Sequence, residues 1–410
     1  MLVLSFCLLL PTSLLAFGFS DTSLMKLPVM YFRSRTITPF SFEDSKVGIN
    51  DLSAGSNMVC GARCLTSQIN CTGFKLDGQQ RCHLLRSWSF ASEQDPSVDG
   101  IKVYEVNASA WSKVMIIGGK TSGYGGTSNI EVIDLVNAKH CTSPTPLLPE
   151  RYAMPSFVLG SKLLVIGGSG NELDITSYNY EAHTWESIGT LAAEWADYSL
   201  GRIRDSWILL MGGDYDGDKT EMTLILNANG SLDPGPDLPM AAKGFCACGL
   251  DDNHIFIAGG KDSGGTELQT TYVLDWTTQQ WASLDPMALP RYYVECGTFL
   301  STNQELSILV VGGLQNQVVI NPHTEIFNWP QQTWRAGPDF AFPKTFLSRM
   351  NKFDGKLFVF GGYQPTSQVF LSDIYMFIPK NESWVRFPLD LNIERRDFGI
   401  MMIPDGIVSC

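Results

Sequence analysis

The chain has 410 residues, of which 44% are hydrophobic, and it carries a formal net charge of −13 at pH 7. This length allows for two structured regions, and the composition is that of an ordinary globular protein. Nucleic-acid binding needs a concentrated basic surface, which so acidic a chain does not predict. After the first residues no apolar run reaches the roughly 20 residues that span a bilayer. We therefore expect no nucleic-acid partner, and no membrane insertion of the mature chain.

The first 18 residues predict a secretory signal peptide. An apolar run is followed by small residues near Ala16 and Gly18, where a signal peptidase could cut. No Lys or Arg precedes Lys26, so an uncleaved membrane anchor is the alternative. Four Asn-X-Ser/Thr triplets also favour export, and the predicted location is extracellular. The glycosylation candidates are Asn70, Asn107, Asn229 and Asn381, of which the last two fall in predicted turns.

Residues 31–106 carry four cysteines, at Cys60, Cys64, Cys71 and Cys82. In a short exported segment this predicts a small module stapled by disulfides. Spacing alone leaves three pairings open, and a zinc site on four thiolates is the alternative.

This cysteine run resembles the core of the PAN/apple family, in which a helix carries two cysteines and the following strands carry the others. The matching positions are Cys60, Cys64, Cys71 with Phe74, and Cys82 with Leu84, and residues 101–106 match the last strand. The resemblance implies a small α+β module with pairs Cys60–Cys82 and Cys64–Cys71. It also implies a role in binding proteins or carbohydrates, without chemistry.

A glycine pair behind a short apolar run recurs six times between residues 112 and 410, at intervals of 45 to 53 residues. Each unit has too little apolar surface to fold alone, so neighbouring units should pack face to face and close into a ring. The pairs are Gly118–Gly119, Gly167–Gly168, Gly212–Gly213, Gly259–Gly260, Gly312–Gly313 and Gly361–Gly362.

Four units also place a tryptophan after a predicted hairpin turn, at Trp185, Trp281, Trp334 and Trp384. There the indole would wedge against the neighbouring unit. Together with a proline and a basic residue that open the next unit, this pattern resembles the kelch repeat over residues 112–410. The resemblance implies an all-β fold, a six-bladed kelch-type β-propeller.

The two ends of this region should meet. The first unit, KVMIIGG from Lys113, has no opening strand before it, whereas residues 394–403 form an opening strand with no glycine pair after it. We expect this tail to pair with the first unit, which would remove free sheet edges.

Five cysteines lie in the repeat region: Cys141, Cys246, Cys248, Cys296 and Cys410. Cys141 and Cys410 both fall in the closing unit and could clasp it, and Cys248 and Cys296 could bridge two neighbouring strands. Burial as free thiols is the alternative. Because five is odd, one thiol should remain unpaired.

Two enzyme classes compete with a binding role. Copper radical oxidases resembling galactose oxidase need tyrosines and histidines that converge on one metal, but the five histidines here are scattered. A sialic-acid mutarotase, which in bacteria resembles this layout, would use Glu295 with Arg291, or Glu194, for acid–base work. Residues 214–221 could hold calcium, but they lack the length and glycine of an EF-hand. We expect no catalytic residue, metal or cofactor.

The predicted ligand face is a ring of residues that open successive units. Repeat symmetry would set them around one mouth of the channel, where cations could attract an anionic ligand; salt bridges to acidic loops are the alternative. They are Arg151, Trp195, Lys243, Arg291, Lys344 and Arg396. The expected function is a secreted, non-catalytic binding or adhesion protein for protein or carbohydrate ligands, with a sugar-acting propeller enzyme as the alternative.

Overall fold

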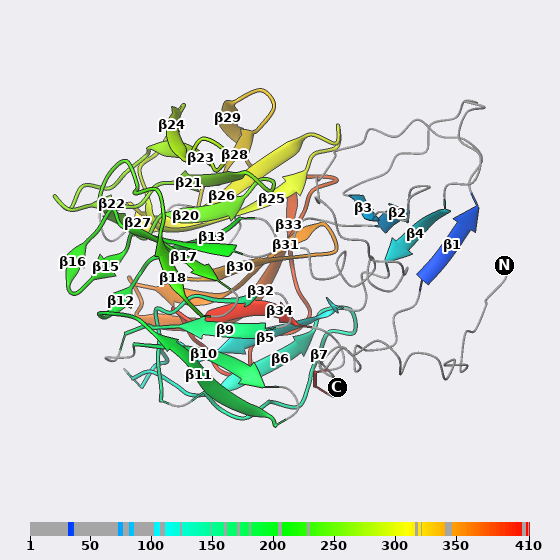
Figure 1. Cartoon of the computed structure of the whole chain (residues 1–410), viewed down its shortest axis with the longest axis horizontal. Coiled ribbons are helices and arrows are strands. Elements are labelled where there is room, and N and C mark those ends of the chain that lie inside the picture. Colours follow the sequence, from blue (N-terminus) through cyan, green and yellow to red (C-terminus); the bar gives the residue numbers. More distant parts are fainter. Residues whose placement is uncertain are drawn as a thin grey trace, which may run out of the picture.

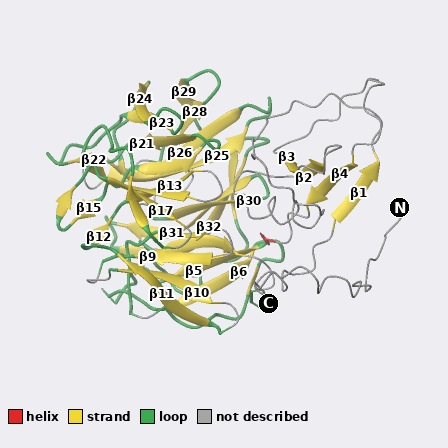
Figure 2. Cartoon of the chain, in the orientation of Figure 1, coloured by secondary structure: helices red, strands yellow, loops and turns green. Residues whose placement is uncertain are grey.

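The computed structural model describes the backbone of four short strands, at residues 32–36, 73–76, 82–85 and 102–106, and most of residues 111–410. In the latter range it omits residues 124, 148, 160–161, 170–172, 180–181, 204–206, 228–229, 316–318, 321, 341–346, 404–406 and 409. The described residues form strands, turns and loops without an α-helix, so the protein is all-β there (Figures 1 and 2). A helix able to cross a membrane is likewise absent from this part of the chain.

Six antiparallel sheets in residues 111–410 each contain a path of four strands, ordered from the innermost strand outward. Sheet 1 contains β34 (Gly399–Ile403), β5 (Lys113–Ile117), β6 (Ile130–Asp134) and β7 (Lys139–His140). Sheet 2 contains β8 (Ser156–Leu159), β9 (Lys162–Ile166), β10 (Asp174–Asn179) and β11 (Thr184–Thr190). Sheet 3 contains β13 (Ser199–Ile203), β14 (Trp207–Met211), β17 (Thr223–Asn227) and β18 (Leu232–Pro234).

The remaining three sheets repeat this order. Sheet 4 contains β20 (Cys246–Gly249), β21 (His254–Ala258), β23 (Thr271–Asp275) and β24 (Gln280–Leu284). Sheet 5 contains β25 (Tyr292–Leu300), β26 (Leu306–Gln315), β28 (Glu325–Asn328) and β29 (Thr333–Ala336), with β27 (Val319–Ile320) paired to β26. Sheet 6 contains β30 (Arg349–Phe353), β31 (Lys356–Gln364), β32 (Val369–Ile378) and β33 (Ser383–Arg386).

Three smaller sheets complete the described topology. Two of them, β12 (Trp195–Ala196), β15 (Asp214–Tyr215) and β16 (Asp218–Lys219), and β19 (Ala242–Lys243) with β22 (Lys261–Asp262), tie the loops after two glycine pairs to segments that precede inner strands. The third joins β1 (Phe32–Thr36), β4 (Lys102–Val106), β2 (Gly73–Leu76) and β3 (Cys82–Leu85). The cysteine pairs predicted for residues 31–106 concern side chains outside the described residues.

The glycine pairs follow the second strand directly in sheets 1 to 4 and lie within it in sheets 5 and 6, where the backbone runs against the neighbouring sheet. All twelve glycines have positive φ. A Cβ on Gly118 would lie 2.6 Å from the carbonyl oxygen of Arg151, too close for any other residue. The amide of Gly119 donates to that same oxygen at 3.0 Å. The pairs therefore combine a left-handed turn with a close contact between sheets, both of which favour glycine.

Consecutive sheets share hydrophobic cores, and so do the sixth and the first. Met115 of sheet 1 packs in one cluster with Val165 of sheet 2, and Phe360 of sheet 6 packs in another with Val114 of sheet 1. Similar clusters fill the other four interfaces. The second strands are therefore buried along most of their length, and β5 along all of it, which explains their continuous apolar sequence.

The predicted pairing of the tail with the first unit is confirmed. Strand β34 pairs antiparallel with β5, with Gly399 opposite Ile117 and Ile403 opposite Lys113. Sheet 1 is therefore built from both ends of the repeat region. A disulfide between Cys141 and Cys410 adds a covalent link in the same sheet.

The repeated tryptophans lie on the outermost strands and contact the preceding unit as well as the core. The indole of Trp185 donates to the carbonyl of Thr145 at 3.1 Å, and that of Trp334 donates to Asp285 at 2.7 Å. Trp281 makes the equivalent bond to Pro236 at 3.1 Å. The indole nitrogen of Trp384 is buried without a hydrogen-bond partner. The predicted wedge between neighbours thus carries a polar anchor in three units.

Candidate binding site at the channel mouth

Two arginines of the predicted ligand face are interior residues. The side chains of Arg151 and Arg291 have no exposed surface. Arg291 Nη2 lies 2.6 Å from Glu325 Oε1, and its Nη1 donates to the carbonyl of His323 at 2.8 Å. Burial lowers the pKa of Arg291, and the Glu325 carboxylate opposes this shift. The prediction that Arg151 and Arg291 face a ligand is wrong, because both are enclosed within their own sheets.

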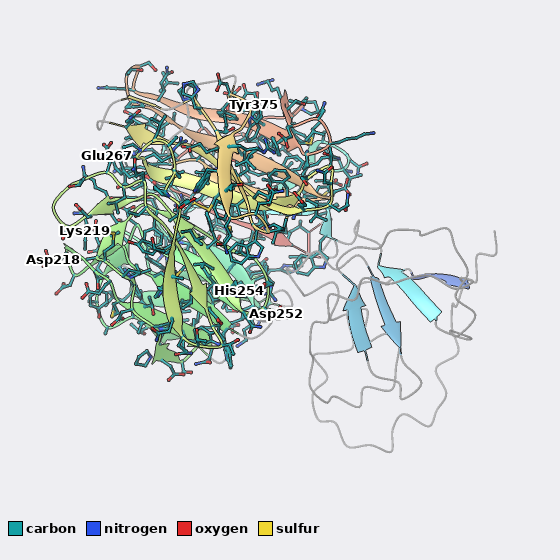
Figure 3. All side chains as sticks on the ribbon, turned by 90° about the horizontal axis from the view of Figure 1, so that it is seen from above. Asp218, Lys219, Asp252, His254, Glu267 and Tyr375 are labelled. Atoms are coloured by element: carbon teal, nitrogen blue, oxygen red, sulfur yellow. A yellow bond between two sulfur atoms is a disulfide. The ribbon has the colours of Figure 1, made fainter. Side chains whose placement is uncertain are left out.

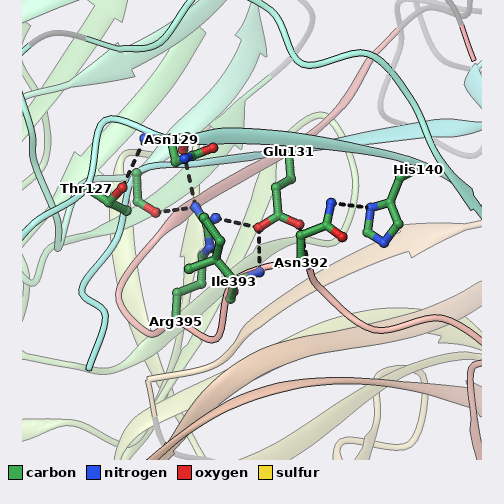
Figure 4. A network of polar contacts seen from close by, with 8 residues as sticks. Thr127, Asn129, Glu131, His140, Asn392, Ile393 and Arg395 are labelled. Atoms are coloured by element: carbon green, nitrogen blue, oxygen red, sulfur yellow. Dashed lines mark hydrogen bonds and ion pairs between the residues drawn. The ribbon is translucent and has the colours of Figure 1, made fainter. Parts of the chain in front are cut away.

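In sheet 1 the equivalent residue is Arg395 rather than Arg396. Arg395 Nη2 lies 2.5 Å from Glu131 Oε1, and Nη1 donates to the carbonyl of Gly118 at 2.7 Å (Figure 4). Glu131 also accepts hydrogen bonds from the amides of Asn392 and Ile393, at 2.6 and 3.1 Å. Because both members of this pair are held by protein groups, it is a structural clamp.

Trp195 occupies the same place in sheet 3. Its side chain is completely buried, and its indole nitrogen donates to the carbonyl of Gly212 at 2.5 Å. Trp195 is therefore also wrongly placed on the predicted ligand face. Like Arg291 and Arg395, it donates to the carbonyl of the first glycine of a pair. Lys344 lies outside the described residues.

Two residues after each of these positions, a ring of backbone forms with one residue from each unit. All six members have φ between 52° and 63°, and they are Ala153, Asp197, Gly244, Tyr293, Leu347 and Asp397. The amide of Ala153 donates to the carbonyl of Asp397 at 2.8 Å, and the amide of Asp397 donates to that of Leu347 at 3.1 Å. Gly244 and Tyr293 donate in the same direction around the ring. We call this end of the channel between the sheets the channel mouth.

Every second position of the ring carries a polar side chain: Asp197, Tyr293 and Asp397. Tyr293 Oη donates to Asp197 Oδ2 at 2.8 Å, and Lys243 Nζ lies 3.2 Å from the same oxygen. Lys243 also forms an ion pair with Asp214. Burial and the neighbouring Asp197 carboxylate raise the pKa of Tyr293. Non-glycine residues held at positive φ are costly and cluster at functional sites.

Asp397 is the most perturbed carboxyl group at the channel mouth. Only 6% of the residue is exposed, and Oδ1 has no hydrogen-bond partner. Burial, reinforced by the charge of Asp197, raises its pKa to about 6. Arg349, Arg396 and Lys120 oppose that shift. The group therefore titrates near neutral pH instead of near pH 4.

A cavity of about 210 Å³ extends from the channel mouth between the inner strands. Its lining includes Asp197, Tyr293, Glu295 and Arg349. Arg349 Nη1 lies 3.2 Å from Glu295 Oε1, and the amide of Met350 donates to Glu295 Oε2 at 3.1 Å. Burial raises the pKa of Glu295, and Arg349 opposes it. Glu295 therefore pairs with Arg349 and not with Arg291, which corrects the predicted acid–base pair.

Around the channel mouth, cations stack on aromatic rings. Lys120 Nζ lies 4.5 Å from the ring centre of Tyr152, and Lys261 Nζ lies 4.9 Å from that of Tyr292. The guanidinium of Arg396 lies 4.7 Å from the ring centre of Tyr363. Of the predicted ligand face, Lys243 and Arg396 thus do lie at this end. Lys243 is engaged by Asp197 and Asp214, and Arg396 by aromatic rings and by Asp397, whose Oδ2 lies 3.6 Å from Arg396 Nη1.

The opposite end of the sheets is formed by the turns between strands. The loop residues Lys219 and Glu267, which follow two glycine pairs, stand away from His254, which follows such a turn (Figure 3). Asn381, a predicted glycosylation site, is exposed in the turn between β32 and β33. The other three candidates lie outside the described residues.

One of the two disulfides in the repeat region involves a different cysteine from the one expected. Cys246 forms a disulfide with Cys296, and Cys248 is a free thiol. The predicted bridge between Cys248 and Cys296 is wrong by two residues along β20, since Cys246 lies on the same side of the strand. The predicted Cys141–Cys410 clasp is present. Burial raises the pKa of the Cys248 thiol to about 12.

The histidines do not converge in the described residues. His254 binds Asp251 at 2.9 Å and His323 binds Asp339 at 2.7 Å, each within its own unit. No group of three or more His, Cys, Asp or Glu side chains able to hold a metal occurs in the part of the chain that the structure describes. Asp214, part of the possible calcium loop, instead pairs with Lys243. Glu194 is not among the residues that line the cavity.

Comparisons with known proteins agree with this architecture. The kelch motif matches residues 242–288 and 350–388. The chain is 21% identical over 257 residues to Adagio protein 3 of Arabidopsis thaliana, covering 55% of this chain and 41% of that protein. It is 25% identical over 207 residues to Beta-scruin of Limulus polyphemus, covering 47% of this chain and 22% of that protein. The chain thus spans less than half of the curated relatives it matches.

Among solved structures, one described as "Structure of YjhT" resembles this fold. The TM-score is 0.56 at 13% sequence identity, and the match covers 67% of this chain and 94% of that one. At this identity the likeness concerns the fold alone. Together with the kelch motifs, it supports a kelch-repeat protein with a propeller-like, all-β fold.

Proposed function

We propose that this chain is a secreted, non-catalytic binding protein for an extracellular protein or glycan. In this proposal, residues 112–410 form a closed six-bladed propeller, residues 31–106 a PAN/apple-like module, and residues 1–18 a signal peptide. The cyclic sharing of cores among six sheets supports the propeller, as does the pairing of β34 with β5. The kelch motifs favour protein–protein interaction.

One observation carries the proposal of a binding face: the channel mouth draws one residue from each of the six units. Four backbone hydrogen bonds link neighbouring members of that ring, and stacked side chains such as Tyr152, Tyr363 and Arg396 surround it. Binding interfaces are enriched in aromatic residues and arginine. A surface assembled from all six units is suited to recognition.

The test compares variants at the two ends of the sheets. The secreted, tagged chain is applied to an array of extracellular proteins and glycans, together with the Tyr152→Ala/Tyr363→Ala double variant. The control is Arg335→Ala, which removes an exposed ion pair with Glu382 at the opposite end. We expect the double variant to lose at least tenfold in affinity and the control to bind normally. Equal binding by all three chains would remove the channel mouth as the binding face.

Export has its own test. Expressed in a secreting cell, the chain should appear in the medium with its amino terminus at or near residue 19. Treatment with peptide N-glycosidase should lower its mass, and Asn381→Gln should remove part of that shift. Retention in the cell with an intact first segment would contradict the secreted location.

A sugar-acting enzyme is the second candidate, because Glu295 is a buried carboxyl of raised pKa beside Arg349 in a cavity. Raised carboxyl pKa values suit general acid–base catalysis. The purified chain is incubated with sialic acid, whose anomer exchange is followed by NMR, and with copper and galactose, from which peroxide would be released. Under the binding proposal neither reaction is accelerated. Anomer exchange abolished by Glu295→Gln would favour the enzyme.

A further inference from the structure

Two cations lie directly opposite each other at the channel mouth. Lys120 follows the glycine pair of sheet 1, and Arg396 precedes β34. Their backbones form an antiparallel bridge, in which the amide of Lys120 donates to the carbonyl of Arg396 at 2.8 Å and the amide of Arg396 donates back at 3.0 Å. Residues paired in this way extend their side chains on the same side, where like charges are destabilising. A counter-charge is therefore expected beside this pair.

The carboxylates of the chain supply little of that counter-charge. Arg396 Nη1 lies 3.6 Å from Asp397 Oδ2, which is beyond hydrogen-bond distance. The side chain of Lys120 forms no ion pair with the described residues. Glu394 is exposed two residues before Arg396, and its Oε1 is bound by Ser122 Oγ at 3.2 Å. Lys120 therefore lacks a carboxylate partner in the described part of the chain, and the cation opposite it is only loosely paired.

Aromatic rings hold both cations in place. Lys120 Nζ lies 4.5 Å from the ring centre of Tyr152, and the guanidinium of Arg396 lies 4.7 Å from that of Tyr363 and 5.6 Å from that of Phe370. Tyr363 and Phe370 are paired across the hairpin of β31 and β32, and all three rings are partly exposed. A stacked cation keeps the N–H donors that do not point at the ring. We call these five residues the mouth cluster.

We propose that the mouth cluster binds a sulfated sugar of a glycan, with the sulfate ester held between Lys120 and Arg396. This rests on the proposed function, which makes the channel mouth the binding face. The three free oxygens of a sulfate ester can accept hydrogen bonds from two cations at once, whereas the two oxygens of a carboxylate are matched by the fork of a single arginine. The sugar ring would lie against the exposed parts of the aromatic rings, as is usual in ligand sites.

Glu394 favours a sugar over an acidic peptide as the carrier of this anion. Ser122, two residues after Lys120, binds Glu394, two residues before Arg396, so the antiparallel pairing places this carboxylate beside the cations. It would repel a second anionic group on the ligand, whereas sugar hydroxyls can donate to its oxygens. The net charge of −13 also disfavours a polyanion. The ligand expected is therefore a sugar with one sulfate and free hydroxyls.

The test measures binding of small probes to the full secreted chain by titration calorimetry. The probe is the methyl glycoside of N-acetylglucosamine 6-sulfate, for which we expect saturable binding. The same glycoside without sulfate tests the role of the anion, and inorganic sulfate tests the role of the sugar ring. Each should bind at least about tenfold more weakly, a loss equal to that of one good contact. A glutamate-rich peptide and heparin should bind more weakly than the sulfated glycoside.

Two variants locate the sulfate. Lys120→Gln and Arg396→Gln each remove one charge of the pair, and each should lower the affinity for the sulfated glycoside at least about tenfold. Lys356→Gln is the matched control, because it removes the same charge from an exposed ion pair with Asp354 at the opposite end; it should bind normally. Since Lys120 and Arg396 repel each other, Lys120→Gln should not lower the melting temperature. Its loss of binding then cannot be attributed to unfolding.

Equal binding of the sulfated and unsulfated glycosides overturns the inference, and so does unchanged affinity in both Lys120→Gln and Arg396→Gln. Tighter binding of the peptide or of heparin, or no binding of the sulfated glycoside by the folded wild-type chain, overturns it as well. This failure is distinct from that of the proposed function. If the sulfated glycoside fails while Tyr152→Ala/Tyr363→Ala still abolishes binding to an array partner, the binding face stands and its ligand is not a sulfated sugar.

Discussion

Arg395 and Asp397 are two residues apart, yet they belong to opposite kinds of polar region. The Arg395–Glu131 pair is enclosed and held by backbone amides and carbonyls on both sides. At the channel mouth, Asp397 is also buried, but its ion pair with Arg396 is long, at 3.6 Å, and its Oδ1 has no hydrogen-bond partner. The neighbouring charge of Asp197 raises the pKa of Asp397 further. Stability requires a buried charge to be matched, so the weakly matched carboxylate of Asp397 indicates a position selected for something other than stability.

We expect the largest effect from disrupting sheet 1, in which β34 pairs with β5. Removal of residues 395–410 deletes Arg395, strand β34 and Cys410 together, leaving β5 with an unpaired edge. We expect no soluble protein in the medium, since an open edge and an uncovered core favour aggregation. A truncated form that is secreted normally, with an unchanged melting temperature, would break the closure model.

Breaking the matched pair should cost much stability. Glu131→Ala leaves the Arg395 guanidinium buried and unpaired, and we expect a loss of about 3 to 5 kcal/mol in the free energy of unfolding. The control, Glu382→Ala, removes a partner of the exposed Arg335 and should cost less than about 1 kcal/mol. Urea denaturation of both variants measures the difference. Similar losses would mean that burial does not distinguish these pairs.

Removing the charge of Asp397 should increase stability, the opposite of the effect expected for Glu131→Ala. The folded-state pKa of Asp397 is about 6, above the unfolded value near 4, so the native chain holds its proton more tightly. Its contribution to stability is present below about pH 4 and is lost as pH rises toward 6. Asp397→Asn should therefore raise the free energy of unfolding at pH 7.5 by up to about 3 kcal/mol, at 1.36 kcal/mol for each pKa unit. Measured at pH 4, the gain should vanish; a constant loss at both pH values would contradict the assignment.

We expect the smallest effect on stability from two tryptophans, of which one has a hydrogen-bond partner for its indole nitrogen and the other has none. Trp185→Phe removes an indole that donates to Thr145, and it should cost about 1 kcal/mol beyond the change in packing. Trp384→Phe removes an indole nitrogen that is already without a partner, and it should be close to neutral. Thermal unfolding of the two variants provides the comparison. A greater loss at Trp384 would show that packing outweighs the hydrogen bond.

The repeating frame could be predicted from the sequence because glycine pairs and tryptophans mark the same place in each unit. The join between the tail and Lys113 followed from counting strands, without any long-range information. The same counting placed Cys141 and Cys410 in the closing unit, which made their bridge possible but did not decide between it and free thiols. The repeat and its closure could be predicted because they depend on the spacing of residues within each unit.

The site could not be predicted in the same way. Adjacent residues Arg395 and Arg396 are equally basic in sequence, and only the distant Glu131 decides which one is buried. The ring at the channel mouth depends on positive φ, yet of its six members only Gly244 is a glycine. One signal was present: four of the ring residues, Ala153, Asp197, Tyr293 and Asp397, follow a buried arginine or Trp195 by two positions. A correct register at Arg395 would have led to Asp397.

Cys141 and Cys410 are 269 residues apart, so their disulfide can form only long after Cys141 has been synthesised. At about 5 to 20 residues per second, a ribosome needs on the order of 10 to 50 s to make the intervening chain. Throughout that interval the nascent β5 waits for β34, and the thiol of Cys141 is open to other oxidants and other thiols. Correct folding therefore depends on protection of β5 and of the Cys141 thiol until β34 and Cys410 have been synthesised.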